Sequence, residues 1–402
     1  MTRRTHWMIS GAVALLTAVF LAGAVRAAGS GAEAPAQAAQ APPPPRQPMA
    51  EEVFKNIQVM KGVPVDEFLG SMGFISNALA VNCTYCHLGE GGGGWAEYAR
   101  DNDKKQMARR MIVMMNAINR TNFAGRRVVT CVSCHNGRNI PATNTKLDAV
   151  YGTPTTDEPD MVARQAPGSP TVDEVLAKYI DAIGGADRVR RLTSFVAKGN
   201  YIGYGDAETV PVEIYAKSPD QLAKVIRTRN GLSSSVYNGR DAWSAVPDAE
   251  TPIPLRQLFG GELEGARLDG QFAFPLDVKA FLTDWRGAMP ATLGDDKDLY
   301  VIQGTSASGL PVKLYFDSES FLLVRQIRYT EGALGRNMTQ IDYDDYKDVA
   351  GVKMPFKWTW AWQSGQGKFE IEDVQANVPV DAARFARPAA PSAPAAPAAP
   401  AR

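Results

Sequence analysis

Residues 65–87 read VDEFLGSMGFISNALAVNCTYCH, and this stretch joins a helical pattern to a short cysteine–histidine motif. Its apolar residues recur at the three- and four-residue spacing of one helix face. They are Val65, Phe68, Leu69, Met72, Ile75 and Leu79. The pattern predicts a helix that ends just before Cys83, and the motif Cys83-Thr84-Tyr85-Cys86-His87 follows at once.

The same arrangement occurs a second time, 48 residues further along the chain. A helix is predicted over residues 97–120, and its apolar side is rich in methionine. Its apolar residues are Met107, Met111, Met114, Met115 and Ile118. Asn122 and Gly125 are stop signals before Cys131-Val132-Ser133-Cys134-His135. The first folded unit is therefore expected to be a helical repeat of two helix–motif modules.

Each C-x-x-C-H motif has the composition of a covalent haem site. Two thiols three positions apart can add to the two vinyl groups on one edge of a haem, and the next residue places an imidazole under the iron. The motifs use every cysteine of the chain, namely Cys83, Cys86, Cys131 and Cys134. We therefore predict two covalently bound haem c groups, with His87 and His135 as iron ligands.

Two other uses of these residues explain less of the sequence. Disulfide bonds would leave both motif histidines unexplained. A zinc site would need further ligands grouped with the cysteines, and the only other histidine is His6.

The sixth iron ligand separates an electron-transfer haem from a catalytic one. A methionine opposite the histidine fills the iron and raises the reduction potential, whereas an open position suits ligand binding or peroxide chemistry. No mature histidine is spare, so bis-histidine ligation within the chain is excluded. Met72, eleven residues before Cys83, is the candidate for the first haem. Its alternative role is core packing.

Several short segments around the two motifs match a known pattern. They are Phe54–Val59, Pro64–Phe68, Met72–Ile75, Ala108–Met111, Ala117–Asn119 and Cys131–Pro141. Over about residues 54–141 the chain resembles the photosynthetic reaction-centre cytochrome c subunit family. The resemblance implies that a helix methionine upstream of the cysteines ligates iron, and this role falls on Met72. The well-known members carry four haems, whereas this chain carries two motifs.

Met111 is assigned to the second haem because it completes Ala108-Arg109-Arg110-Met111, which resembles the same family. Methionines three and four apart share a helix face, so the others are expected to pack. Arg109 and Arg110 could pair with haem propionates or form a solvated helix face.

The remaining segments differ in composition from the motif region. Residues 1–27 have a basic start and an apolar run, which predict an export signal peptide, with an uncleaved membrane anchor as the alternative. The other segments are an Ala/Pro-rich tether at 28–48, a dihaem domain at 49–150, a linker at 151–170, a second domain at 171–385 and a disordered Ala/Pro tail at 386–402. Lys+Arg and Asp+Glu both total 43, so the net charge gives no reason to expect a nucleic-acid partner.

The second domain is predicted to be mainly antiparallel β structure. A helix is expected over residues 172–183, and alternating stretches then predict strands. These strands are Val210–Ala216, Leu222–Thr228, Leu299–Gln303, Val312–Phe316, Phe321–Tyr329 and Phe369–Val374. Asn238-Gly239 and residues 317–320 predict hairpin turns. The predicted fold class is α+β multidomain, with a helical dihaem c-type cytochrome domain followed by a curved antiparallel sheet, or half-barrel, with helices.

Three segments of this second domain are similar to domains of the lipoprotein-carrier type, namely Pro211–Lys217, Tyr237–Trp243 and Tyr315–Asp317. The resemblance implies a curved sheet closed by helices around an apolar cavity. Four tryptophans could line such a cavity and bind an apolar ligand, or they could fill an ordinary core. They are Trp243, Trp358, Trp360 and Trp362.

These features predict one-electron transfer by an exported dihaem c-type cytochrome, in the periplasm or outside the cell. Its partners would be a redox-protein donor and acceptor, and a membrane electron-transfer complex is one candidate. The first alternative is a haem enzyme, a peroxidase or small-molecule reductase acting at the second haem. The second is a hydrophobic-ligand-binding protein whose haems report binding. The sequence of the second domain shows no recognisable arrangement of acid/base or nucleophilic catalytic residues.

Overall fold

The computed structural model describes residues 46–87, 95, 97–144, 163–203, 209–248, 251–293 and 297–391. Residues from Arg46 onward form one compact unit. The predicted signal peptide, most of the tether, most of the linker and the end of the Ala/Pro tail lie outside the described residues. Within the described residues, no helix is both long enough and apolar enough to cross a membrane.

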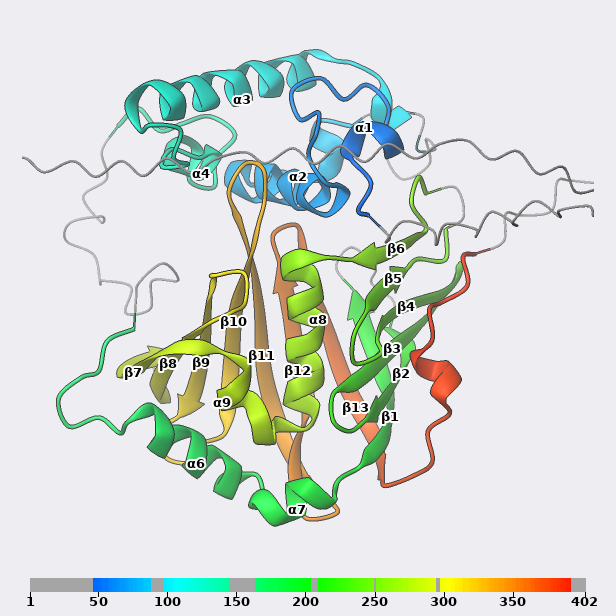
Figure 1. Ribbon diagram of the computed structural model, residues 1–402. Coiled ribbons are helices and arrows are strands. Elements are labelled where there is room, and N and C mark those ends of the chain that lie inside the picture. The colour runs from blue at the N-terminus through cyan, green and yellow to red at the C-terminus, as the bar shows by residue number, and fades with distance from the viewer. Residues whose placement is uncertain are drawn as a thin grey trace, which may run out of the picture. The chain divides into compact units, whose positions relative to one another are not determined.

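The first part of this unit is helical, as predicted (Figure 1). Its elements are α1 (Ala50–Val53), α2 (Val65–Leu79), η1 (Cys83–Tyr85), η2 (Glu97–Ala99), α3 (Asp103–Asn122) and α4 (Cys131–His135). Helix α3 begins later than predicted, because the Asn102 side chain accepts a hydrogen bond from the Lys105 amide and caps the helix there. The helices share one buried apolar cluster, the helical core, which contains Ala50, Met60, Phe68, Phe74, Ile112, Met115 and Leu334.

The second part is a 13-stranded sheet. Its strands are β1 (Ser194–Gly203), β2 (Thr209–Lys217), β3 (Gln221–Thr228), β4 (Gly231–Tyr237), β5 (Ala242–Ala245), β6 (Leu255–Leu258), β7 (Thr283–Leu293), β8 (Lys297–Thr305), β9 (Pro311–Asp317), β10 (Leu323–Glu331), β11 (Arg336–Val349), β12 (Val352–Trp362) and β13 (Gly365–Ala376).

The strands lie in the order β6-β5-β4-β3-β2-β1-β13-β12-β11-β10-β9-β8-β7. The first strand, β1, therefore pairs with the last one, β13, and this pairing is antiparallel. Strands β6 and β7 are the two edges, so the sheet stays open as a half-barrel. The predicted antiparallel sheet and the predicted hairpin turn at Asn238-Gly239, between β4 and β5, are both confirmed.

One face of the sheet carries the main core. Helices α6 (Val172–Ala182), α7 (Ala186–Arg191), α8 (Gly260–Ala273) and α9 (Val278–Phe281) pack there, with η3 (Pro275–Asp277) between α8 and α9 (Figure 1). Leu268 of α8 and Val278 of α9 are buried with Leu314 and Phe316 of β9. Neighbouring Tyr315 belongs to a different cluster, as expected for side chains that alternate between the faces of a strand.

The four tryptophans do not share one site. Trp358 and Trp360 pack against the main core. Trp243 belongs instead to a cluster with Tyr215 and with Phe385 of η4 (Ala382–Phe385). Trp362, at the end of β12, is 40% exposed.

A buried ionic group fixes α8 to the sheet. Asp269 of α8 accepts hydrogen bonds from Arg328 Nη1 on β10, at 2.5 Å, and from Lys224 Nζ on β3, at 3.2 Å. Burial raises the pKa of the Asp269 carboxyl, but the charges of Arg328 and Lys224 outweigh it and hold the pKa below its ordinary value. The carboxyl is therefore ionised at neutral pH and ties α8 to two strands.

Helix α2 packs directly against the sheet. Leu334, in the turn between β10 and β11, is 1% exposed and is a member of the helical core. Gly335 lies so close to α2 that an added Cβ would come within 2.3 Å of the Phe74 ring. Arg256 of β6 also donates a hydrogen bond to α2, at the carboxylate of Asp66. The β10–β11 hairpin is thus part of the packing of α2.

The end of the predicted linker is bound to the sheet. The Ala163 amide donates to Gln303 Oε1 on β8 at 3.2 Å, and the Ala166 amide donates to the Ala288 carbonyl on β7 at 3.0 Å. Ala163 is 1% exposed. Contacts with the sheet therefore begin before the first residue of α6.

Candidate haem-binding site

The second motif forms a short helix of its own. Helix α4 spans the whole motif, and the Thr130 amide before it donates to Ser133 Oγ at 3.0 Å. After it, Asn136 and Gly137 have positive φ angles and turn the chain back. The Gly137 amide then donates to the Ala78 carbonyl of α2 at 2.9 Å. The motif is therefore held against the end of the first helix.

The imidazole of His135 has one ring nitrogen already engaged. Its Nδ1 lies 2.8 Å from the carbonyl oxygen of Arg138. A backbone carbonyl only accepts, so Nδ1 carries the proton and Nε2 keeps its lone pair. This is the common way in which proteins orient a histidine for a metal.

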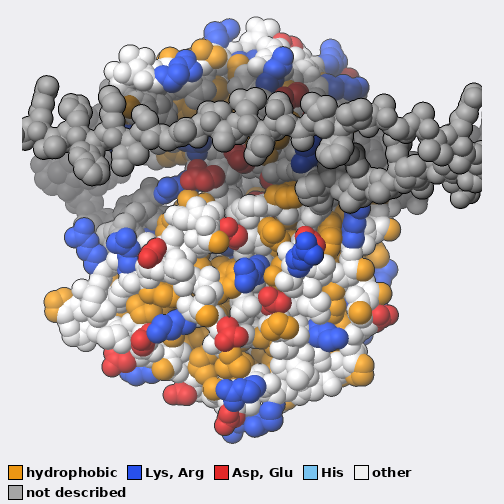
Figure 2. Space-filling view, viewed as in Figure 1, with side chains coloured by type: hydrophobic (Ala, Val, Ile, Leu, Met, Phe, Trp, Pro, Cys, Tyr) orange, Lys and Arg blue, Asp and Glu red, His pale blue; other side chains and the backbone are white. Residues whose placement is uncertain are grey.

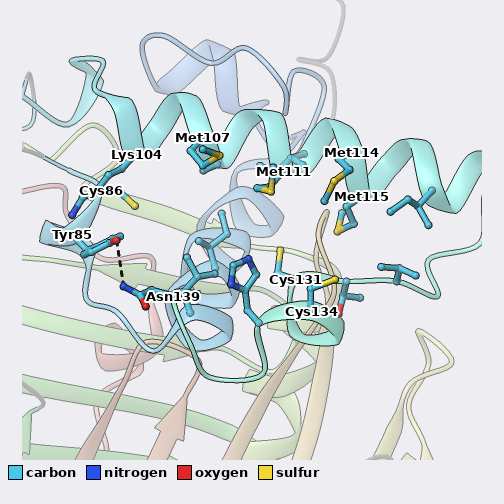
Figure 3. Close-up of a pocket in the computed structure, with 18 of the residues that line it drawn as sticks. Tyr85, Cys86, Lys104, Met107, Met111, Met114, Met115, Cys131, Cys134 and Asn139 are labelled. Atoms are coloured by element: carbon cyan, nitrogen blue, oxygen red, sulfur yellow. Dashed lines mark hydrogen bonds between the residues drawn. The ribbon is translucent and has the colours of Figure 1, made fainter. Parts of the chain in front are cut away.

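A cavity of about 340 Å³ lies between α2, α3 and α4. Its polar and sulfur-bearing lining includes Cys131, Cys134 and His135 from the second motif, Tyr85 and Cys86 from the first, and four methionines of α3. Figure 3 shows the side chains of Met111, Met114 and Met115 pointing from α3 toward Cys131 and Cys134 on α4. The structure thus brings Met111 together with His135 and both cysteines of the second motif. An apolar cavity bordered by two thiols and a free imidazole nitrogen fits a covalent haem.

The first motif has a matching histidine arrangement. The Nδ1 atom of His87 lies 3.1 Å from the Tyr98 carbonyl oxygen, and its ring stacks on the Tyr98 ring at a centroid distance of 4.8 Å. Burial and the charge of Lys105 lower the pKa of His87, against the effect of the Tyr98 hydrogen bond. The imidazole is therefore neutral near pH 7, which is the form that binds iron.

Polar contacts around the first motif join it to α3 and to the second motif. The Asn102 side chain donates to the Cys86 carbonyl at 2.8 Å. The Lys104 ammonium lies over the Tyr85 ring, 3.3 Å from its centroid. The Tyr85 hydroxyl accepts a hydrogen bond of 3.5 Å from Asn139, beyond the second motif (Figure 3). The two motifs are therefore neighbours in space.

The placement of Met72 differs from that of Met111. Met72 is half-buried on α2 and packs against the helical core, as do Val129 and Cys131. Neither Met72 nor His87 lines the 340 Å³ cavity. Residues 88–94, which follow His87 directly, lie outside the described residues. The ligand pair of the first haem thus stays a prediction.

The four thiols fall into two groups. Cys83 and Cys134 are exposed, whereas Cys86 and Cys131 are half-buried. Burial raises the pKa of the Cys86 and Cys131 thiols. Free Cys86 and Cys131 would therefore be protonated near pH 7 rather than reactive thiolates.

The two arginines before Met111 have different surroundings. Arg109 Nη1 lies 2.5 Å from Asp101 Oδ1, and the Arg109 side chain is 18% exposed. Arg110 is exposed, and its Nη2 lies 3.8 Å from the sulfur of Met107. Neither arginine lines the cavity, and the exposed side chain of Arg110 fits the second alternative, a solvated helix face.

Sequence reasoning did not find the groups that orient the histidines. The acceptors are the backbone carbonyls of Tyr98 and Arg138, and a carbonyl carries no residue-type signal. Asn102 could have been found, because Asn is a preferred N-cap residue directly before a helical pattern.

The helical part thus carries two C-x-x-C-H motifs and is joined to an antiparallel β unit. Residues 23–167 match the family model described as "Photosynthetic reaction centre cytochrome C subunit". The predicted resemblance of the motif region to this family is confirmed.

Curated relatives agree over the same region. The chain is 35% identical over 98 residues to the photosynthetic reaction center cytochrome c subunit of Thermochromatium tepidum, which is 23% of this chain and 23% of that protein. It is 33% identical over 100 residues to the subunit of Rubrivivax gelatinosus, which is 23% of this chain and 25% of that protein. The chain thus spans about a quarter of the length of these relatives.

Solved structures similar to this chain cover about half of it. A LolA superfamily protein from Nitrosomonas europaea covers 54% of this chain and 98% of its own, with 17% identity and a TM-score of 0.36. A DUF1329 family protein from Desulfovibrio piger covers 54% of this chain and 97% of its own, with 14% identity and a TM-score of 0.38.

Proposed function

We propose that this chain is an exported dihaem c-type cytochrome that passes single electrons between two redox proteins. The main support is the second motif, where Cys131, Cys134, His135 and Met111 border one apolar cavity. In both motifs the histidine Nδ1 is held on a backbone carbonyl, which leaves Nε2 for iron.

The residues of each site have separate tasks. A bound haem supplies a reversible one-electron couple at its iron. Cys131 and Cys134 would hold the group covalently, and His135 would present Nε2 to its iron. Met111 would supply a soft sulfur donor to the iron and would favour the reduced state. Met115, which is buried, adds apolar surface to the cavity, and an apolar surrounding also favours the less charged reduced state.

Export is part of the proposal, because residues 1–27 have the pattern of a signal peptide and covalent haem attachment is typical of exported proteins. We place the protein in the periplasm or at the cell surface. Its donor and acceptor are redox proteins, and one of them can belong to a membrane electron-transfer complex.

The enzyme alternative requires an open sixth position at the second haem. Four methionines of α3 line the cavity, which favours a filled position and hence electron transfer. Rapid binding of carbon monoxide to one high-spin haem in the unmodified protein would favour the enzyme instead.

Haem counting by the pyridine haemochrome assay tests the proposal. The full chain, made in a host that attaches haem c, should carry two haems that resist acid–acetone extraction. A variant with Cys83→Ala and Cys86→Ala should keep one, and so should its counterpart with Cys131→Ala and Cys134→Ala. A redox titration should then resolve one-electron steps. Haem that is extracted by acid acetone would contradict the proposal.

A further inference from the structure

Positive charge is concentrated in the segment that carries the second site. Residues 97–138 contain nine Lys and Arg residues against three Asp and Glu residues, although the whole chain has 43 of each kind. Two haems would bring four propionates, which offset part of this excess. The remaining chain is correspondingly acidic, so the excess is a local feature.

Several of these cations are already engaged. Arg100 pairs with Glu97, Arg109 with Asp101 and Arg127 with Glu331. Arg110 and Arg120 of α3 are different, because both are exposed and neither forms an ion pair within the described part of the chain. These two guanidinium groups are available to a partner.

Exposed apolar side chains lie beside the two arginines. Met107, Arg110, Val113, Met114 and Arg120 follow one another at helical spacing along α3, and we call them the α3 stripe. The apolar members are 48% exposed for Met107, 53% for Val113 and 46% for Met114. Figure 2 shows Lys and Arg side chains beside hydrophobic ones over the helical part, at the top of the view. Arginine with exposed apolar residues is the composition of a protein interface core.

The α3 stripe borders the second site. Met107 and Met114 belong to the stripe and also line the 340 Å³ cavity. A protein that covers the stripe would therefore lie next to a haem in that cavity. Electron transfer requires the two redox groups to be close to each other. Complementary charge steers such encounters and accelerates association.

We propose that the α3 stripe is the docking surface for an acidic redox protein that exchanges electrons with the second haem. This inference names the partner class for the proposed function and rests on it. Arg110 and Arg120 provide the charge attraction, and Val113 and Met114 provide the apolar contact.

Stopped-flow oxidation of the reduced, haem-loaded full chain tests the proposal, with plant plastocyanin as an acidic blue-copper probe. At low salt, Arg110→Glu with Arg120→Glu should slow the second-order rate constant about tenfold or more. The same change should flatten the dependence of the rate constant on ionic strength. Oxidation by the small cation tris(phenanthroline)cobalt(III) should not slow.

The matched control carries Arg190→Glu with Arg240→Glu, which makes the same charge change on exposed arginines of the β-rich part. If both double variants slow the rate equally, the net charge of the protein governs the rate, and the assignment of the α3 stripe as the docking surface is wrong. Normal haem content with no difference between the variants would overturn docking alone, whereas missing haem would overturn the proposed function.

Two further outcomes would replace the acidic partner by another occupant. A dimer in sedimentation velocity that Arg110→Glu with Arg120→Glu abolishes would assign the stripe to a second copy of this chain. Binding to phosphatidylglycerol vesicles, lost in the same variant, would assign it to an anionic membrane. Either result overturns the proposal.

Discussion

Arg256 Nη1 on β6 lies 2.5 Å from Oδ1 of Asp66 on α2, and this pair joins the sheet to the helix that carries Met72. The Asp66 side chain is 7% exposed and that of Arg256 is 23% exposed. Burial raises the pKa of Asp66, even though the Arg256 charge lowers it. Folding therefore shifts Asp66 toward its protonated form relative to the unfolded chain.

This raised pKa predicts how stability depends on pH. A carboxyl whose pKa is raised on folding stabilises the fold below its unfolded pKa, and this contribution disappears as pH rises through the folded pKa. Arg256→Ala removes the ion-pair partner of Asp66 and raises the Asp66 pKa further. We expect a loss of about 1–3 kcal/mol at pH 7, which becomes smaller toward pH 4 as Asp66 is protonated. Urea unfolding at both pH values measures it.

The control for this prediction is Arg240→Ala, because the Arg240 side chain is 90% exposed. It should change stability little at either pH. An Arg256→Ala loss that is equal at pH 7 and pH 4 would show that Asp66 does not govern the effect.

Met72→Ala should remove methionine ligation from one haem and lower its reduction potential, because the thioether favours reduced iron. Spectroelectrochemical titration measures the change. Met60→Ala is a matched control, since Met60 is 9% exposed in the same helical core. It should lower stability by about 2–5 kcal/mol and leave both potentials in place. Equal redox behaviour of the two variants would assign Met72 to packing.

Met111→Ala should convert the second haem to a high-spin form that binds carbon monoxide, because the cavity would lose its ligand to iron. Magnetic circular dichroism of Met107→Ala, Met111→Ala, Met114→Ala and Met115→Ala separates the ligand from its neighbours. Only the Met111 variant should lose the methionine signature. If another of the four variants loses it, the ligand is that methionine.

Leu334→Ala should loosen α2, because this side chain of the β10–β11 turn is buried in the helical core. The expected cost is about 2–5 kcal/mol. Hydrogen exchange should speed up in α2 more than in β8 and β9. Leu310→Ala is the control, since Leu310 is 3% exposed in a cluster of the sheet, and it should give the opposite pattern. Unchanged protection of α2 in Leu334→Ala would mean that the hairpin does not support the helix.

The spacing of apolar residues predicted those helices and strands in which buried and exposed positions alternate regularly along the chain. Helix α2 spans Val65–Leu79, the residues of the predicted apolar face, and β2, β3, β8 and β9 extend the predicted strands by one or two residues at an end. In β9, Val312, Leu314 and Phe316 are buried in the main core, so the alternation in sequence is the alternation of faces.

Helix α8 was not predicted, and its glycines explain why. The sequence GGELEGARLDGQFA contains residues that disfavour helices in isolation. Packing requires them, because a Cβ at Gly270 would lie 2.0 Å from the Asp220 carbonyl oxygen, and one at Gly265 would lie 2.9 Å from Arg328 Nε. Strands β11 and β12 were also missed. In β11 the polar run that contains Asp342, Asp344 and Asp345 obscures the pattern.

The sequence by itself determined which residues are suited to covalent haem attachment, because the covalent chain sets the spacing between the two thiols and the imidazole of each motif. It also determined that a helical region precedes a β-rich region, because the spacing of apolar residues within a short segment indicates whether that segment is a helix or a strand. Tertiary structure decided which groups meet. Only folding places Met111 across a cavity from His135, holds each histidine Nδ1 on a distant or turned-back carbonyl, and buries Leu334 of the sheet in the helical core. These contacts depend on how separate elements pack, and packing joins residues that no local pattern relates.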